Sequence, residues 1–155
     1  MSVAFRRDSD EEHLEPRFAL PLPPGPNLVT KRGFDLIKAR NEALEQELSA
    51  APLGDRRTEL LRDARYWRSR LTTAQLVPIP SGRHVAIGTI VTIERDGYRR
   101  IVEVVGHDES DPAIGRIGFA APLARALAGA EVGDEVELPA PVGLVTVTDI
   151  SIAAE

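Results

Sequence analysis

Two stretches of heptad spacing, separated by a short turn, constrain the fold of this chain more than any other feature. The first stretch has apolar residues and one asparagine at intervals of three and four, at Phe34, Ile37, Asn41, Leu44 and Leu48. The second has a matching series at Leu60, Ala64, Trp67, Leu71 and Ala74. This spacing predicts two amphipathic helices, each about 20 residues and roughly 30 Å long.

Capping and breaking residues set the expected ends of these helices. Thr30 is a good N-cap for the first helix, and Pro52 and Gly54 stop it. The second helix is predicted over residues 56–76, ahead of Pro78. Two seams of equal length joined by a short turn fold back on each other, so we expect an antiparallel helical hairpin that forms a short coiled coil.

One polar residue interrupts the first seam. Pairing the two helices about the turn places Asn41 and Trp67 in the same layer. The Asn41 side-chain carbonyl can then accept a hydrogen bond from the indole N–H, which satisfies both groups. On this interpretation Asn41 sets the register of the hairpin. The alternative is that Asn41 lies at a solvated edge of the seam.

From His84 onward the spacing changes from helical to that of β-strands. HVAIGTIVTIE and YRRIVEVVG are rich in β-branched residues and flank Asp96-Gly97, a pair typical of a hairpin turn. Further expected strands are GRIGFA, VEL and GLVTVTDISI. PLARALAG is an expected short helix, with proline in its first turn and Gly129 at its C-cap. The fold class is therefore α+β, with the helical hairpin followed by a small antiparallel sheet and one short helix.

The chain has three expected parts. Residues 1–29 contain an acidic cluster and a proline-rich run, a composition that predicts a disordered tail. The cluster consists of Asp8, Asp10, Glu11, Glu12 and Glu15. Residues 30–77 form the coiled-coil hairpin, and residues 83–155 form the β-rich domain.

Charge is distributed unevenly along the chain, whose formal net charge is −5 at pH 7. The second helix is basic, with Arg56, Arg57, Arg62, Arg65, Arg68 and Arg70 against only Glu59 and Asp63. After Arg125 there is no Lys or Arg. A basic middle flanked by acidic ends suggests oriented docking on a charged partner, and the alternative is that these are solvated helix faces.

Composition excludes several classes of site. The chain has no cysteine, so disulfides and thiolate metal sites are absent. His13, His84 and His107 lack close metal-ligand spacing. Aromatic residues make up 5%, which argues against a nucleic-acid stacking platform. No apolar run approaches the roughly 18 residues of a membrane span, and the N-terminus lacks a secretory h-region. We expect a cytoplasmic protein with no membrane partner.

The run APLARALAGAEVGDEV in the β-rich domain carries a family resemblance. From Val85 to about Ile152, the sequence resembles the FKBP-like C-terminal domain of the bacterial GreA/GreB transcript-cleavage factors, whose pattern is close to SPLARALLGKKVGDEV. Four positions in the hairpin also resemble the family, namely Thr30, Gly33, Gly54 and Asp55. The short hairpin is similar to that of Rnk, a Gre-like regulator of nucleoside diphosphate kinase. The resemblance implies an FKBP-like fold for residues 83–155.

The same resemblance implies a function. Gre factors dock their globular domain on RNA polymerase at the mouth of the secondary channel and insert the coiled coil into it. Acidic residues at the tip help to hold a second Mg²⁺ at the polymerase active site, because hard divalent cations prefer oxygen ligands. Asp55 stands at one such position and is the candidate ligand of this shared Mg²⁺, with Glu59 as a second tip candidate. On this basis the chain is not itself an enzyme and has no cofactor of its own.

The tip departs from the family pattern, which runs Gly-Asp-x-x-Glu-Asn-x-x-Tyr. Thr58 stands in place of the glutamate, and Glu59 follows one residue later, which rotates the side chain by about 100° around a helix. Arg56 and Arg57 place positive charge where a cation should bind. The hairpin is also shorter than in the cleavage factors. These differences favour a protein that occupies the channel over one that stimulates cleavage.

The candidate residues for partner contacts are Pro122, Leu123, Arg125, Arg62 and Arg65. Arg125 is the best single docking candidate because it is charged beside an apolar helix face, and the arginines of the second helix are candidates for contacts to nascent RNA or to polymerase acids. The family has an acid-Ser-Pro run before the short helix, where this chain has Ala120-Ala121-Pro122. The serine N-cap is therefore lost, at a cost of about 1 kcal/mol to that helix.

Two other classes of function stay open. An FKBP-like fold suggests a prolyl isomerase, which needs an apolar pocket lined by aromatic residues, and the β-rich domain has only Tyr98 and Phe119 as aromatics. The second class is a binding module for another partner, including a Rnk-like regulator of nucleoside diphosphate kinase. We expect a monomer when the protein is free.

Overall fold

The computed structural model describes residues 19–154, so the acidic cluster and most of the predicted tail lie outside the described residues. The described chain divides into two compact units. Residues 38–72 with 19–25 form the hairpin unit, and residues 26–37 with 73–154 form the sheet unit. No helix between residues 19 and 154 is long and apolar enough to cross a membrane.

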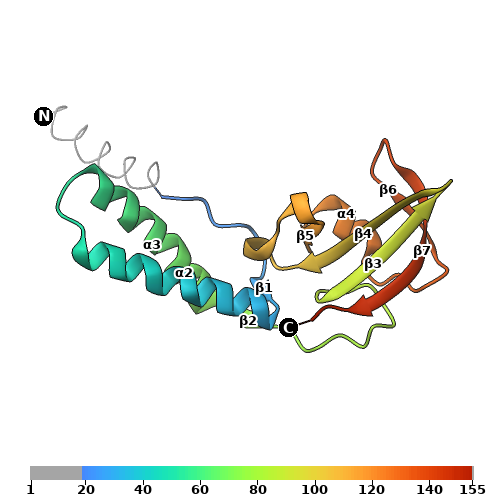
Figure 1. Cartoon of the computed structure of the whole chain (residues 1–155), viewed down its shortest axis with the longest axis horizontal. Helices are drawn as coiled ribbons and strands as arrows, with labels where there is room; N and C mark the ends of the chain where they lie inside the picture. The colour runs from blue at the N-terminus through green and yellow to red at the C-terminus, as the bar shows by residue number, and fades with distance from the viewer. Residues whose placement is uncertain (1–18, 155) are drawn as a thin grey trace, which may run out of the picture. The chain divides into compact units, whose positions relative to one another are not determined.

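The hairpin unit is built from two long helices. Helices α2 (Lys31–Ala50) and α3 (Asp55–Thr73) lie side by side and run in opposite directions, which confirms the predicted hairpin (Figure 1). Leu60 and Ala64 of α3 are buried, as the heptad spacing predicts. Two ion pairs also join the helices on their exposed surfaces, Arg68–Glu45 at 3.4 Å and Arg56–Glu47 at 3.0 Å.

The predicted hydrogen bond between Asn41 and Trp67 is wrong. Asn41 is buried, with 7% of its surface exposed, so it does not lie at a solvated edge either. Its Oδ1 atom has no hydrogen-bond partner. Trp67 instead packs edge-on against Tyr66, with ring centroids 5.2 Å apart, and the Arg40 guanidinium lies 5.7 Å from its centroid. Cation–π and aromatic contacts therefore surround the indole.

The ends of α2 and α3 follow from local chemistry. The Gly33 N–H donates to Thr30 Oγ1 at 3.0 Å, so Thr30 is the N-cap of α2, as predicted. Helix α3 begins at Asp55, directly after Gly54, whose φ of 140° lies in the region that favours glycine. It ends at Thr73 rather than near residue 76, because the chain then enters a strand.

Two short strands flank the helices. Strand β1 (Leu28–Val29) pairs in parallel with β2 (Gln75–Leu76). The pairing extends by a hydrogen bond from Val77 N–H to the Val29 carbonyl at 2.9 Å. The sequence analysis assigned residues 28 and 29 to the tail, since a two-residue strand has too little periodicity to detect. In the structure this segment belongs to the sheet unit.

The sheet unit contains five strands in the order β5-β4-β3-β7-β6. They are β3 (Thr89–Arg95), β4 (Tyr98–Val105), β5 (Arg116–Gly118), β6 (Glu135–Leu138) and β7 (Gly143–Ile152). Asp96 and Gly97 both have positive φ, 47° and 82°, as a tight hairpin turn between β3 and β4 requires. The α+β class is confirmed.

One feature of the sheet differs from the prediction. Strand β5 runs parallel to β4, so the sheet is mixed rather than wholly antiparallel. The connection between the two strands contains two 3-10 turns, η1 (His107–Glu109) and η2 (Pro112–Ile114). Parallel neighbours need such a crossover, because a two-residue hairpin returns the chain in the opposite direction.

The core of this unit lies between the sheet and helix α4 (Pro122–Leu127), and Leu127 is fully buried in it. Ala121 occupies the N-cap position of α4 without a side-chain hydrogen bond, as expected from the missing serine. Gly129 has a φ of 81°, which suits the turn that follows the helix.

Candidate functional site

The loop between α2 and α3 presents one carboxylate that has no partner. Asp55 is exposed and is the first residue of α3. Within residues 19–154, its side chain makes no ion pair or hydrogen bond. A negative charge is favoured at this end of a helix, where the backbone N–H groups are unpaired. Asp55 is therefore available to an external cation or donor.

The two arginines beside Asp55 are engaged inside the hairpin. Arg56 forms ion pairs with Glu47 at 3.0 Å and with Glu59 at 3.4 Å. Arg57 Nη1 donates to the carbonyl oxygens of Leu48 and Ala51 at 2.9 and 3.1 Å, which caps the C-terminal end of α2. Arg57 therefore stabilises the turn, and Arg56 neutralises Glu59.

The tip does not form a Mg²⁺ site by itself. Magnesium binds oxygen ligands in octahedral geometry. Within residues 19–154, Asp55 is the only carboxylate of the tip without a partner, because Glu59 is paired with Arg56. Between residues 19 and 154 there is no group of three or more His, Cys, Asp or Glu side chains that fits a metal ion. The tip can supply at most one ligand to a metal that another protein holds.

The arginines of α3 differ in their availability. Arg65 is exposed, and in the described part of the chain it has no ion pair. Arg62 lies 3.6 Å from Asp63, and Arg68 pairs with Glu45. Arg70 is buried, with 5% exposed. Of the two candidates on this helix, Arg65 is the exposed one, and it has no ion pair within residues 19–154.

The second group of candidates lies on α4. Pro122 and Arg125 are exposed, while Leu123 is half-buried against the core of the sheet unit. Leu123 and Arg125 therefore have different environments: one supports the helix from beneath and the other presents a charge on its surface. Arg125 belongs to the sheet unit and Arg65 to the hairpin unit.

The structure also contains a polar cluster that the sequence analysis missed. Residues 107–109 form a short 3-10 turn, and the Glu109 side chain is only 2% exposed. Its carboxylate accepts hydrogen bonds from Thr30 Oγ1 at 2.7 Å and from Arg32 Nε. Arg32 also donates through Nη2 to Glu103 of β4. This Thr30–Arg32–Glu103–Glu109 cluster attaches the first turn of α2 to the sheet.

The electrostatics of the cluster favour the charged guanidinium. Burial alone would lower the pKa of Arg32, but the hydrogen bonds that its guanidinium donates to Glu103 and Glu109 outweigh this effect and raise the pKa above its ordinary value. Gly33 is part of the same arrangement. A Cβ atom at this position would lie 2.8 Å from Glu109 Oε1. Gly33, which the sequence analysis noted only for its resemblance to the family, thus has a physical role: it leaves room for the Glu109 carboxylate beside Thr30.

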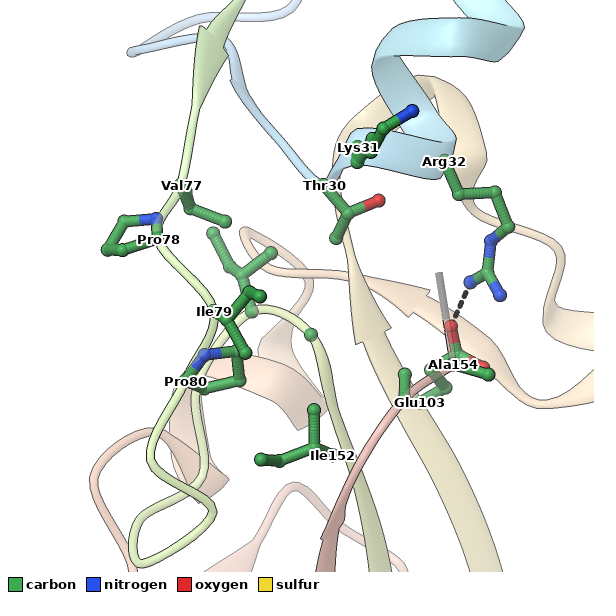
Figure 2. Close-up of a pocket in the computed structure, with 13 residues that line it drawn as sticks. Thr30, Lys31, Arg32, Val77, Pro78, Ile79, Pro80, Glu103, Ile152 and Ala154 are labelled. Carbon is green, nitrogen blue, oxygen red and sulfur yellow. Dashed lines mark hydrogen bonds and ion pairs between the residues drawn. The ribbon is translucent and has the colours of Figure 1, made fainter.

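A small pocket lies next to this cluster in the sheet unit. Its volume is about 130 Å³. Figure 2 shows its walls: the segment Val77–Pro80 on one side, Thr30 and Arg32 at the start of α2, and Ile152 with Ala154 near the C-terminus. The ion pair between Arg32 and Glu103 forms its polar edge. None of the lining residues is aromatic.

Comparisons with known proteins give one consistent result. A family model described as "Transcription elongation factor, GreA/GreB, C-term" matches residues 80–154. The chain is 33% identical over 128 residues to the transcription elongation factor GreA of Desulfovibrio desulfuricans, across 77% of this chain and 79% of the relative. It is 32% identical over 144 residues to the transcription elongation factor GreB of Pasteurella multocida, across 77% and 90%. The crystal structure of GreA factor homolog 1 of Thermus thermophilus matches 82% of this chain and 99% of that chain, at 22% identity and a TM-score of 0.41.

Proposed function

This chain belongs to the GreA/GreB family of transcription elongation factors, and we propose that it binds RNA polymerase at the secondary channel and modulates elongation by occupying that channel. The family resemblance implies the partner and the channel. The tip geometry supports occupation rather than stimulation of transcript cleavage, because within the described residues the tip has a single carboxylate without a partner, Asp55.

The chemistry of the tip carries this proposal. In a two-metal mechanism, a weakly held second Mg²⁺ needs several oxygen ligands to activate water and to stabilise the leaving oxygen. Glu59 cannot join Asp55 without giving up its ion pair with Arg56, and Thr58 stands where the family has a glutamate. Asp55 alone therefore gives the shared metal too little support for efficient cleavage.

Two surfaces are proposed for the contact with the polymerase. On the sheet unit, Pro122 and Arg125 present an exposed corner of α4, with Leu123 holding the helix against the core. On the hairpin, Arg65 is exposed and has no ion pair among the described residues, so it suits an acidic side chain or the phosphates of the nascent RNA. Arg62 lies on the same helix and would join it once released from Asp63.

We propose that the chain has no enzymatic activity of its own. A prolyl isomerase needs an apolar pocket with aromatic walls, and the pocket beside Arg32 has none and encloses only about 130 Å³. The alternative function, regulation of nucleoside diphosphate kinase as in Rnk, is not supported by the GreA and GreB relatives named above, because both are transcription elongation factors. We propose a monomer in the free state that uses no cofactor besides the Mg²⁺ of the polymerase.

Photo-cross-linking from the tip tests the location of the hairpin. A photoreactive amino acid replaces Asp55, and the variant is bound to RNA polymerase and irradiated. We expect cross-links to the segments that line the secondary channel, and none from a matched variant at Glu137, which is exposed on β6. A protein that binds the polymerase but cross-links elsewhere from position 55 would refute the proposed location.

A further inference from the structure

The tip of the hairpin presents an apolar side chain beside its free carboxylate. Leu53 has 92% of its surface exposed, the largest fraction for a large apolar residue within residues 19–154, against 68% for Ile79. Single exposed leucines are common on protein surfaces, so exposure alone does not define a contact. The hydrogen bonds and charges of the loop around Leu53 are a further reason to expect a contact there.

This loop is held in place by several hydrogen bonds. Arg57 binds the carbonyl oxygens of Leu48 and Ala51 on one side of Leu53. On the other side, Thr58 donates from both its backbone N–H and its hydroxyl to the Gly54 carbonyl, at 3.1 and 3.3 Å. Leu53 therefore extends from a turn whose backbone is restricted by hydrogen bonds. Binding a partner through Leu53 costs less conformational entropy than binding through a loop that must first become ordered.

The same contacts define what the tip offers to a partner. Glu47 and Glu59 balance the charge of Arg56, and the Arg57 guanidinium donates to backbone carbonyls at the end of α2. Within residues 19–154, the groups of the tip left without a partner are the Leu53 side chain and the Asp55 carboxylate, two positions apart. An apolar group next to an acid fits a recess with an apolar wall and a cation or N–H donor at its edge.

We propose that Leu53 is the anchor of the tip and inserts into an apolar recess of RNA polymerase, next to the point that Asp55 faces. This inference rests on the proposed function and adds to it a source of affinity that does not depend on metal binding. The hairpin then stays in the channel through burial of the leucine, whether or not Asp55 reaches a metal.

Binding measurements with matched variants test the anchor. Affinity for core RNA polymerase is measured for the whole protein and for Leu53→Ser, Leu53→Met and Leu61→Ser. Since Leu53 is almost fully exposed, its variants should melt at the temperature of the parent, which circular dichroism checks. Removing a buried leucine from an interface should weaken binding about tenfold or more, and methionine should keep it within about twofold. Leu61→Ser is the control, since Leu61 is 46% exposed on α3, away from the loop.

The possible outcomes separate the inference from the proposed function. Selective weakening by Leu53→Ser, with normal binding by the other two variants, supports the anchor. Equal binding by Leu53→Ser and the parent, or equal weakening by Leu61→Ser, overturns it while the proposed function stands. Failure of the parent protein itself to bind the polymerase overturns the proposed function.

Discussion

Thr30 and Glu109, which are 79 positions apart in the sequence, share a hydrogen bond in which Thr30 Oγ1 donates to Glu109 Oε1 at 2.7 Å. The same threonine oxygen accepts the Gly33 N–H, and Arg32 donates to the other carboxylate oxygen of Glu109. The cap of α2 is thus completed by a residue of the sheet unit. We therefore expect substitutions in this cluster to change the stability of the protein.

Replacing Glu109 by glutamine should destabilise the protein by about 1–3 kcal/mol, because the charge that pairs with Arg32 is removed while the shape is kept. The lower end of this range reflects the partial exposure of Arg32, which keeps Glu103 and some water as partners. Urea unfolding measures the change. Glu137→Gln, at an exposed position on β6, is the control and should change stability by less than about 0.5 kcal/mol. Equal effects from both variants would contradict the structural role of Glu109.

Gly33→Ala should destabilise the protein although alanine is the better helix former by about 1 kcal/mol. The added Cβ would lie 2.8 Å from Glu109 Oε1, in a carboxylate that Thr30 and Arg32 hold in place. In a Glu109→Ala background the contact is absent, so the same substitution should become neutral or stabilising. Unfolding of the four proteins of this double-mutant cycle gives the coupling. A Gly33→Ala effect that is independent of residue 109 would exclude this contact as its cause.

Arg57→Ala should loosen the end of α2 near the tip. Two carbonyl oxygens, those of Leu48 and Ala51, lose their donor, which should cost about 1–2 kcal/mol locally. Hydrogen exchange of the amides in the last turn of α2 is the measurement, since the effect is confined to one end of the hairpin. Arg56→Ala removes only exposed ion pairs and should change exchange by less than about 0.5 kcal/mol. Faster exchange in the Arg56 variant than in the Arg57 variant would contradict the assignment of the cap.

Ala121→Ser should stabilise helix α4 by about 0.5–1 kcal/mol, because the N-cap position has an extended backbone, with φ −66° and ψ 148°, but no side-chain acceptor. Thermal unfolding followed by circular dichroism should show a higher melting temperature. Ala120→Ser places the same hydroxyl one residue outside the cap and should have no effect. The prediction fails if neither serine, or both, raise the melting temperature.

The sequence predicts those parts of the fold that depend on neighbours close in the chain. The heptad spacing predicts the hairpin of α2 and α3, because side chains three and four positions apart lie on one helix face. Thr30 as N-cap and Asp96-Gly97 as turn are equally local. The α+β class follows from the spacing of strands and short helix, and the family resemblance from Val85 to about Ile152 implied the FKBP-like fold.

Features that depend on distant residues were not predictable in this way. Glu109 stands in an ordinary turn sequence, and only the tertiary fold brings it to Thr30 and Arg32. Asn41 and Trp67 were matched by seam position, but heptad spacing gives no information about how Arg40 and Tyr66 orient around the indole. Strand β5 has three residues, too few to indicate its direction.

At the tip too, the sequence predicted the local features, and the contacts between the two helices were not predicted. The sequence identified Asp55 and predicted that Arg56 and Arg57 would oppose a cation there. The structure adds that Arg56 pairs with Glu59, the second carboxylate of the tip, and that Arg57 donates to backbone carbonyls and keeps its positive charge two positions from Asp55.

A transcript-cleavage assay on backtracked elongation complexes tests the central claim most directly. Saturating amounts of this protein are added alone, and then in competition with a GreA that stimulates cleavage. Occupation of the secondary channel predicts no increase in cleavage by the protein alone and a concentration-dependent loss of the cleavage that GreA produces. Stimulation of cleavage by this protein that disappears in Asp55→Ala would contradict the account, because it would show that the single carboxylate completes the metal site.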